Sequence, residues 1–147
     1  MKSNIMSKII KDLQEGDKLY FFFRDKIDEY TVKGTEPARE KRFGTSFYDE
    51  PKEEFVFKIA CKEFSLPLTL YSGQWYNDWY STNVATDEGY TFGIYATSIK
   101  KIKEVLEMRY NYALKEKEMV IKHADEAIAQ AREQLKNFDQ TISNESK

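Results

Sequence analysis

The order of apolar and polar residues divides the chain near residue 97. Up to that point, short runs rich in Val, Ile, Phe and Tyr alternate with turn residues, a pattern typical of β-strands. Beyond Gly93 the chain contains no glycine or proline and is rich in Lys, Glu, Ala, Gln and Leu, a composition that favours helix. We therefore predict an α+β fold, with an antiparallel β-sheet or small barrel of about five strands followed by a long C-terminal helix or helical hairpin.

The predicted β domain covers residues 1–97 and begins with a short helix. In "SKIIKDLQ", Ile9, Ile10 and Leu13 face one way, and Ser7 is placed as an N-cap. The strongly β-prone run at residues 19–23 and the segment "IDEYTVKG" then form a hairpin. Further strands are predicted in "EFVFKIACKEF", "LPLTLY" and "YTFGIYAT". No helices separate these strands, which favours an antiparallel sheet.

Residues 35–52 are predicted to form a long loop. This stretch is polar and contains the breakers Pro37, Gly44 and Pro51, with the charged "AREKRFG" between them. A short strand near "SFY" is the one regular element expected within it.

The predicted helix begins after Ser98, a candidate N-cap, and continues to residue 138. Only Lys117 interrupts its apolar stripe. A helix of about 40 residues is roughly 60 Å long, whereas a compact domain of about 100 residues measures some 30 to 35 Å, so the sheet cannot cover the whole stripe. The stripe repeats near a 3.6-residue period and consists of Ile99, Ile102, Leu106, Tyr110, Ala113, Val120, Ala124, Ile128, Ala131, Leu135 and Phe138.

The uncovered part of the stripe needs another apolar surface, which leaves two alternatives. The helix either folds back as a hairpin near residues 117–123 or pairs with the same helix of another subunit. The small side chains of Ala124, Ala127 and Ala131 allow close approach of a partner helix, and the absence of helix breakers favours one long helix in a homo-oligomer. Residues 98–138 are thus predicted as an oligomerisation segment and residues 139–147 as a flexible tail.

Composition excludes several classes of protein. The chain has 41% hydrophobic and 33% charged residues and a formal net charge of -2, which gives no general electrostatic attraction for duplex nucleic acid. No basic start with an apolar segment and no run of about eighteen apolar residues occurs, so neither secretion nor membrane insertion is predicted. We expect a cytoplasmic protein.

Catalytic and metal-binding patterns are scarce. The single cysteine, Cys61, alternates with apolar residues along a predicted strand and is interpreted as a buried small hydrophobe. The single histidine, His123, is interpreted as a polar residue of the helix surface. We recognise no phosphate-binding glycine loop, nucleophile elbow or calcium loop, and the carboxylate clusters are typical of solvated loops. No catalytic residue, metal site or cofactor is predicted.

The stretch "YSGQWYNDWYSTN", residues 71–83, is the main candidate for recognition. Large aromatic side chains beside amides suit stacking on a planar ligand or a protein partner, although closing the core of the small sheet is the commoner use of such residues. If the stretch binds a ligand, Trp75 and Trp79 supply stacking faces, while Asn83 or Tyr90 adds hydrogen bonds.

Arg109 is the candidate anion contact, because it falls in the middle of the helix close to the apolar stripe and beside two tyrosines. A guanidinium can bind a phosphate with two donors and also stack on a ring. The alternative is an arginine that lies along the helix or pairs with a glutamate one turn away. Arg39 and Arg42 are further candidates, with solvated charge as their alternative.

Two resemblances add to these predictions. "LQEGDKLYFFF" followed by "IDEYTVKG", and "YTFGIYATSIKKIKEVLE", resemble the first hairpin and the last strand and helix of small β-barrel proteins of phages that infect Gram-positive bacteria. The layout of about five antiparallel strands and C-terminal helices is similar to that of phage Thoeris anti-defence sponges. The second resemblance implies an oligomer that sequesters a cyclic nucleotide-like immune signal between its subunits.

We therefore predict a non-catalytic phage or prophage anti-defence protein that binds a small nucleotide-derived molecule at an oligomer interface. The alternatives are a protein-protein interaction module that inhibits a host protein, a phage assembly factor, or an enzyme with a carboxylate-based site.

Overall fold

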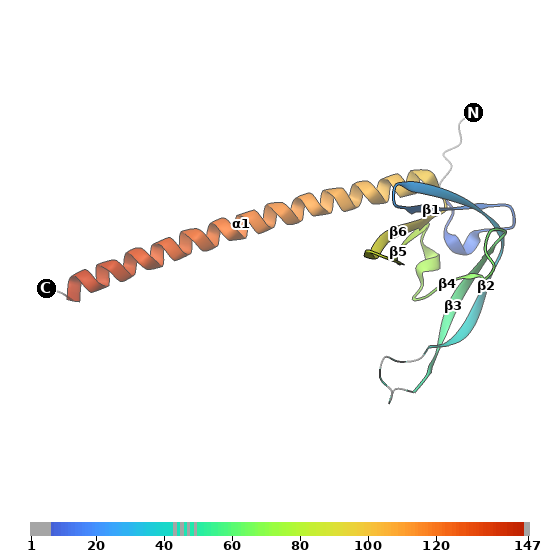
Figure 1. Cartoon of the computed structure of the whole chain (residues 1–147), viewed down its shortest axis with the longest axis horizontal. Helices are drawn as coiled ribbons and strands as arrows, with labels where there is room; N and C mark the ends of the chain where they lie inside the picture. Colours follow the sequence, from blue (N-terminus) through green and yellow to red (C-terminus); the bar gives the residue numbers. More distant parts are fainter. Residues whose placement is uncertain (1–6, 43, 45, 47, 49, 146–147) are drawn as a thin grey trace. The chain divides into compact units, whose positions relative to one another are not determined.

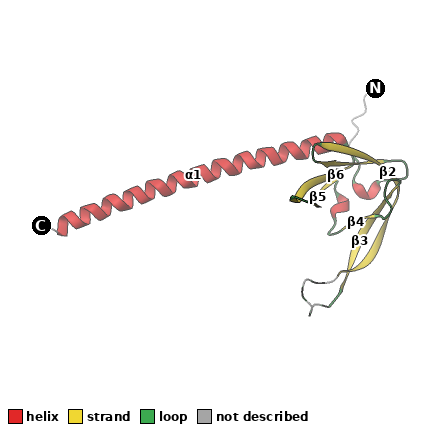
Figure 2. Cartoon of the chain, in the orientation of Figure 1, coloured by secondary structure: helices red, strands yellow, loops and turns green. Residues whose placement is uncertain are grey.

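The computed structural model describes residues 7–42, 44, 46, 48 and 50–145, and it has the predicted α+β layout (Figures 1 and 2). Two compact units are present, Met1–Val105 and Leu106–Lys147. The first unit holds the strands and two short 3-10 turns, and the helix begins in it. In chain order the elements are η1 (Ile10–Asp12), β1 (Lys18–Phe23), β2 (Lys26–Arg42), β3 (Lys52–Cys61), β4 (Leu68–Leu70), η2 (Gln74–Tyr76), β5 (Trp79–Thr86), β6 (Gly89–Ala96) and α1 (Ile99–Glu145).

The six strands of the described chain form one antiparallel sheet in the order β4-β3-β2-β1-β6-β5. The order begins with β4 and ends with β5, so the sheet is open, and the alternative of a small barrel is wrong. The strand that the sequence did not predict is β5, whose residues belong to the aromatic stretch that resembled a loop. It pairs along its whole length with β6, from Trp79 opposite Ala96 to Thr86 opposite Gly89.

The prediction of a long loop at residues 35–52 is wrong for residues 35–42, because strand β2 continues to Arg42. Its first half pairs with β1 and its second half with β3, and the register shifts between Val32 and Gly34. Pro37 lies in the half of β2 that pairs with β3 and not with β1, so one edge of the strand lacks a strand partner there, a setting in which a proline is tolerated.

Cross-strand charge pairs hold the polar second half of β2 to β3. Lys58 Nζ lies 2.7 Å from Glu40 Oε1, and Arg42 Nη1 lies 3.1 Å from Glu54 Oε2. Opposite charges on neighbouring strands stabilise a pairing that an apolar pattern would not indicate. Of the short strand predicted near "SFY", the described residues Ser46 and Tyr48 are not in a strand, and Phe47 lies outside the described residues.

The core lies on one face of the sheet, where η1 and η2 cover it. Cys61 is 1% exposed, which confirms its interpretation as a buried hydrophobe. Partly buried Tyr30, Phe64, Leu68 and Tyr95 pack against this cluster. The cluster itself consists of Ile10, Leu13, Leu19, Val32, Phe57, Ile59, Cys61, Leu70, Trp75 and Tyr80.

The opposite face is also buried near β6. Ile94 and Ala96 point away from the core cluster and are fully buried, as are Ile102 and Val105 in the first turns of α1. We infer that these first turns cover Ile94 and Ala96. Ser98 is confirmed as the N-cap, since its Oγ accepts a hydrogen bond of 3.2 Å from the backbone N–H of Lys101.

The segment before β1 differs from its prediction. The expected helix is a single 3-10 turn that begins after Ile9, without a side-chain cap. Ser7 is therefore not an N-cap, and its Oγ instead lies 2.7 Å from Oγ of Ser98. The burial of Ile10 and Leu13 agrees with the predicted apolar side of the segment.

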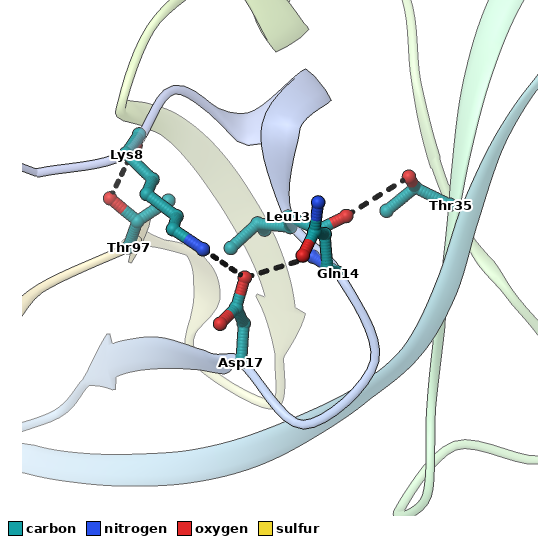
Figure 3. A network of polar contacts seen from close by, with 6 residues as sticks. All are labelled: Lys8, Leu13, Gln14, Asp17, Thr35 and Thr97. Atoms are coloured by element: carbon teal, nitrogen blue, oxygen red, sulfur yellow. Dashed lines mark hydrogen bonds and ion pairs between the residues drawn. The ribbon is translucent and has the colours of Figure 1, made fainter.

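Polar contacts around Asp17 connect this segment to the sheet (Figure 3). One carboxylate oxygen of Asp17 accepts hydrogen bonds from Lys8 Nζ at 2.8 Å and from the backbone N–H of Gln14 at 2.9 Å. The Lys8 bond, followed by the Gln14 bond, lowers the pKa of the Asp17 carboxyl. Thr97 Oγ1 donates to the Lys8 carbonyl at 2.7 Å, and Thr35 Oγ1 donates to the Leu13 carbonyl at 3.3 Å.

Replacing Asp17 with alanine should lower the free energy of unfolding by about 1 kcal/mol at pH 7, because it removes two hydrogen bonds. An acid whose pKa is lowered by folding stabilises the fold above its unfolded-state pKa, and this contribution is lost as the pH falls through the folded-state value. The difference from wild type should therefore shrink below pH 4. Urea denaturation at pH 7 and pH 3 measures both values, with exposed Glu15→Ala as the control; an equal loss at both pH values would contradict the ionic origin.

Helix α1 is continuous from Ile99 to Glu145, so the hairpin alternative is wrong. Its 47 residues correspond to about 70 Å at 1.5 Å per residue. The helix also extends past Phe138 into the predicted tail, of which residues 146–147 lie outside the described residues. The side chains described beyond Leu106 are exposed, including that of His123, as predicted.

Candidate binding surfaces

Trp75 is a core residue. It lies in η2, after Gly73 in a left-handed conformation with φ of 73°, and is 5% exposed. Its ring stacks on Phe57, with centroids 5.8 Å apart, and meets the edge of Phe55 at 6.0 Å. Because neither face of the indole is open to solvent, we assign Trp75 to closing the core and leave it out of any ligand site.

Three other predicted residues, Trp79, Asn83 and Tyr90, lie on one face of the β5–β6 hairpin. Asn83 is opposite Phe92 and Tyr90 is opposite Ala85, in the same register that places Trp79 opposite Ala96. Directly opposed residues of an antiparallel pair, and alternate residues along each strand, point to the same side. This is the side of Ile94 and Ala96, opposite to the core cluster.

Strand β1 extends this surface. Tyr20 is opposite Ala96 and Phe22 is opposite Ile94, so both point to the same side. We call this surface the outer aromatic face and define it by Tyr20, Phe22, Trp79, Asn83, Tyr90 and Phe92. Exposure rises toward the hairpin turn: Trp79 and Phe92 are half-buried, whereas Tyr90 is 80% exposed. The result is a row of rings with an amide beside them and an open end.

The other side of the same strands carries stacked rings that serve the core. Tyr80 stacks on Tyr95 with centroids 5.0 Å apart, and Tyr95 stacks on Phe21 at 4.3 Å. Burial raises the pKa of both tyrosines, that of Tyr95 to about 12. Burial likewise raises the pKa of the Cys61 thiol to about 11. These groups are neutral at physiological pH, so Cys61 does not offer a thiolate nucleophile.

A groove of about 280 Å³ lies beside the register shift of β2. Its charged groups are of both signs, since Lys58 is paired with Glu40 and Glu36 lies in the wall. Such a mixed lining gives no clear preference for an anion or a cation. The residues around the groove are Lys33, Gly34, Thr35, Glu36, Lys58, Ala60 and Pro67.

The arginines predicted as anion contacts lie on different elements. Arg42 forms an ion pair with Glu54, and its guanidinium lies over the ring of Tyr71, 5.0 Å from the ring centroid. Its positive charge is therefore already paired within the sheet. Arg39 is exposed on β2, opposite Phe55. Arg109 is exposed on α1 in the unit Leu106–Lys147. We therefore do not assign Arg109 to the outer aromatic face.

A second candidate surface lies on α1 and was only partly recognised in the sequence. Large aliphatic side chains recur at an interval of seven residues and are 43 to 63% exposed. The 3.6-residue stripe included two of these residues and missed three. The strict seven-residue spacing in the sequence is the signal that identifies all five residues. We call this set the aliphatic column: Leu114, Ile121, Ile128, Leu135 and Ile142.

Among the described residues, no group of three or more His, Cys, Asp or Glu side chains is placed to hold a metal ion. In the same part of the chain, no helix is long and apolar enough to cross a membrane. Comparison with protein families, curated proteins and solved structures gives no match for this chain. The outer aromatic face and the aliphatic column are therefore the features of the chain from which a function can be inferred.

Proposed function

We propose that this chain is a non-catalytic binding protein of the host cytoplasm, in which α1 assembles the oligomer and the outer aromatic face recognises a small, planar, nucleotide-derived molecule. The observation that carries the proposal is the alignment of Trp79, Asn83 and Tyr90 on one sheet face that is open toward the β5–β6 turn. In this assignment Tyr90, whose strand partner Ala85 lies two residues from Asn83, stacks on the base, and the Asn83 amide selects its polar edge.

Stacking on an open sheet gives only one wall of a site. Tightly bound small molecules are usually enclosed over most of their surface, whereas Tyr90 is 80% exposed. Another protomer of the assembly supplies the missing wall if the site forms between subunits. The exposed aliphatic column is the feature that favours such an oligomer, since large apolar side chains at seven-residue spacing are typical of helices that pair.

The open end of the outer aromatic face also favours a second candidate, a protein partner. Exposed tyrosine and half-buried tryptophan are the side chains that dominate protein-protein hot spots, and a flat surface suits a protein better than a small molecule. A phage-encoded inhibitor of a host protein or an assembly factor would use the same residues. The two candidates therefore share a site and differ in what occupies it.

Titration with cyclic dinucleotides, cyclic trinucleotides and ADP-ribose isomers separates the candidates. We expect calorimetry to detect binding of one of these probes below about 10 μM, and we expect Tyr90→Ala to weaken it at least tenfold because a stacking face is lost. Tyr76→Ala is the matched control, since Tyr76 is 58% exposed but lies in η2, outside the outer aromatic face. If no probe binds while a host protein co-purifies with wild type and not with Tyr90→Ala, the protein partner is correct and the nucleotide proposal fails.

A further inference from the structure

A second column of residues, with side chains of different sizes, lies beside the aliphatic column on α1. Three residues after each of its members on α1 come, in order, Lys117, Ala124, Ala131, Phe138 and Glu145. Positions three apart share a helix face, so the two columns form one stripe with the a and d spacing of a coiled coil. In the middle of the stripe, large side chains alternate with alanine.

This alternation fits an antiparallel pair of helices. In a parallel pair each residue opposes its own copy, so Ile128 would face Ile128 and Ala131 would face Ala131. Layers filled by two large side chains would then alternate with layers that two alanines leave underfilled. In an antiparallel pair centred between these two residues, Ile128 faces Ala131 of the second copy. The same register places Leu135 opposite Ala124 and Ile121 opposite Phe138. In the four central layers each large aliphatic side chain then packs on an alanine. Ile121 and Phe138 form a wider layer on either side of this centre, and at the ends Leu114 faces Glu145 and Ile142 faces Lys117.

The charges of α1 favour the same orientation. A parallel pair would bring the two Lys117 ammonium groups together in the stripe, whereas the antiparallel pair places Lys117 near Glu145 of the second copy. Asp125 and Arg132 flank the aliphatic column on one side, and in the antiparallel register each faces the other residue across the interface. One contact opposes this register, because Glu118 faces Asp139, although Lys122 and Lys136 lie one turn from these carboxylates.

We propose that the aliphatic column binds a second copy of this chain in antiparallel orientation, with Ile128 packed against Ala131 at the centre of the pair. This inference depends on the self-association in the proposed function and specifies its partner and register. It is independent of the ligand at the outer aromatic face. The N-terminal ends of the two paired helices then lie at opposite ends of the pair, so the second wall of a ligand site at the outer aromatic face would come from a protomer outside this pair.

Distances between spin labels test the orientation directly. Glu116, Gln130 and Asn144 are exposed and share one side of α1 outside the stripe, since they are spaced by 14 residues. In the antiparallel register, residue 130 lies near its own copy, so Gln130→Cys labels should be on the order of 20 Å apart. Two labels at residue 116 are separated by the rise of 27 residues, about 40 Å along the axis. Wild-type protein is the labelling control, because Cys61 is buried and should take up little label.

The expected result is a short distance for Gln130→Cys, a long one for Glu116→Cys, and a short one in a mixture of Glu116→Cys and Asn144→Cys chains. Short distances for both single variants would mean a parallel pair and overturn the inference while leaving self-association intact. A monomer mass for the wild-type chain in sedimentation would instead overturn self-association itself.

Charge exchange gives a second readout that needs no label. Asp125→Arg should weaken the pair several-fold, because two arginines then face each other at each of two symmetric positions. Asp125→Arg combined with Arg132→Asp should restore the dissociation constant. In a parallel pair these positions face uncharged residues of the other helix, so a failure of the double variant to restore binding would contradict the antiparallel register.

Discussion

Replacing Ile128 with glutamate should convert the proposed pair of chains to monomer at micromolar concentration. Ile128 is 56% exposed on the helix and occupies the middle of the aliphatic column. A charged carboxylate there would be buried against the apolar stripe of the second copy at two symmetric positions. We expect a cost of at least about 3 kcal/mol, which corresponds to more than a 100-fold weaker dissociation constant. Sedimentation at several protein concentrations measures the change.

The adjacent residue provides a matched control. Ala129→Glu introduces the same charge one position along, where the helix turns by about 100° and the side chain leaves the stripe. This variant should keep the wild-type mass. Equal loss of mass in both variants would mean that net charge, and not burial in the stripe, causes dissociation. An unchanged mass in Ile128→Glu would remove the aliphatic column from the interface.

The sequence predicts the helix well because the information for it is local. The absence of glycine and proline after Gly93 and the Ser98 cap define a continuous element, and both features are present in the structure. The choice between a hairpin and a long helix could also be made from the missing breakers. The pairing partner of the helix is a different question, because a surface that contacts a second chain imposes no local conformation on the first.

The errors in the β domain have a common physical cause. Residues 35–42 resemble a loop because Pro37 and the charged side chains are poor strand formers, yet strand β3 holds them in the sheet through the Glu40–Lys58 and Arg42–Glu54 pairs. Such pairs join residues that are distant in sequence. A propensity calculated along the chain therefore does not detect them.

Prediction of the candidate site from sequence fails for a similar reason, here within a stretch of five residues. Trp75 and Trp79 are four residues apart, a spacing that places both on one face of either a helix or a strand. The chain instead changes from the 3-10 turn η2 to strand β5 between them, so Trp75 enters the core and Trp79 joins the outer aromatic face. The composition of this stretch suited both recognition and core closure, with core closure the commoner use, and the structure places Trp75 in the core.

Trp75→Ala should have the largest effect on the stability of the unit Met1–Val105. The indole is 5% exposed, stacks on Phe57 and contacts the edge of Phe55, so its removal leaves a cavity in the core. Large-to-small changes of buried aromatic residues cost about 3 to 5 kcal/mol, a large share of the 5 to 15 kcal/mol that stabilises a typical domain. Guanidinium denaturation measures the loss. The emission of the remaining Trp79 should be followed, because α1 dominates the circular dichroism.

Tyr76→Ala is the control for this variant, since Tyr76 is the next residue of η2, contacts the Trp75 ring at 5.8 Å and is 58% exposed. Its loss should cost about 1 kcal/mol, because most of the ring already faces water in the folded chain. Both proteins must be compared at one concentration, because self-association contributes to apparent stability. A loss below about 1 kcal/mol for Trp75→Ala would mean that the core closes without the indole, and Trp75 would then return to the list of side chains available for recognition.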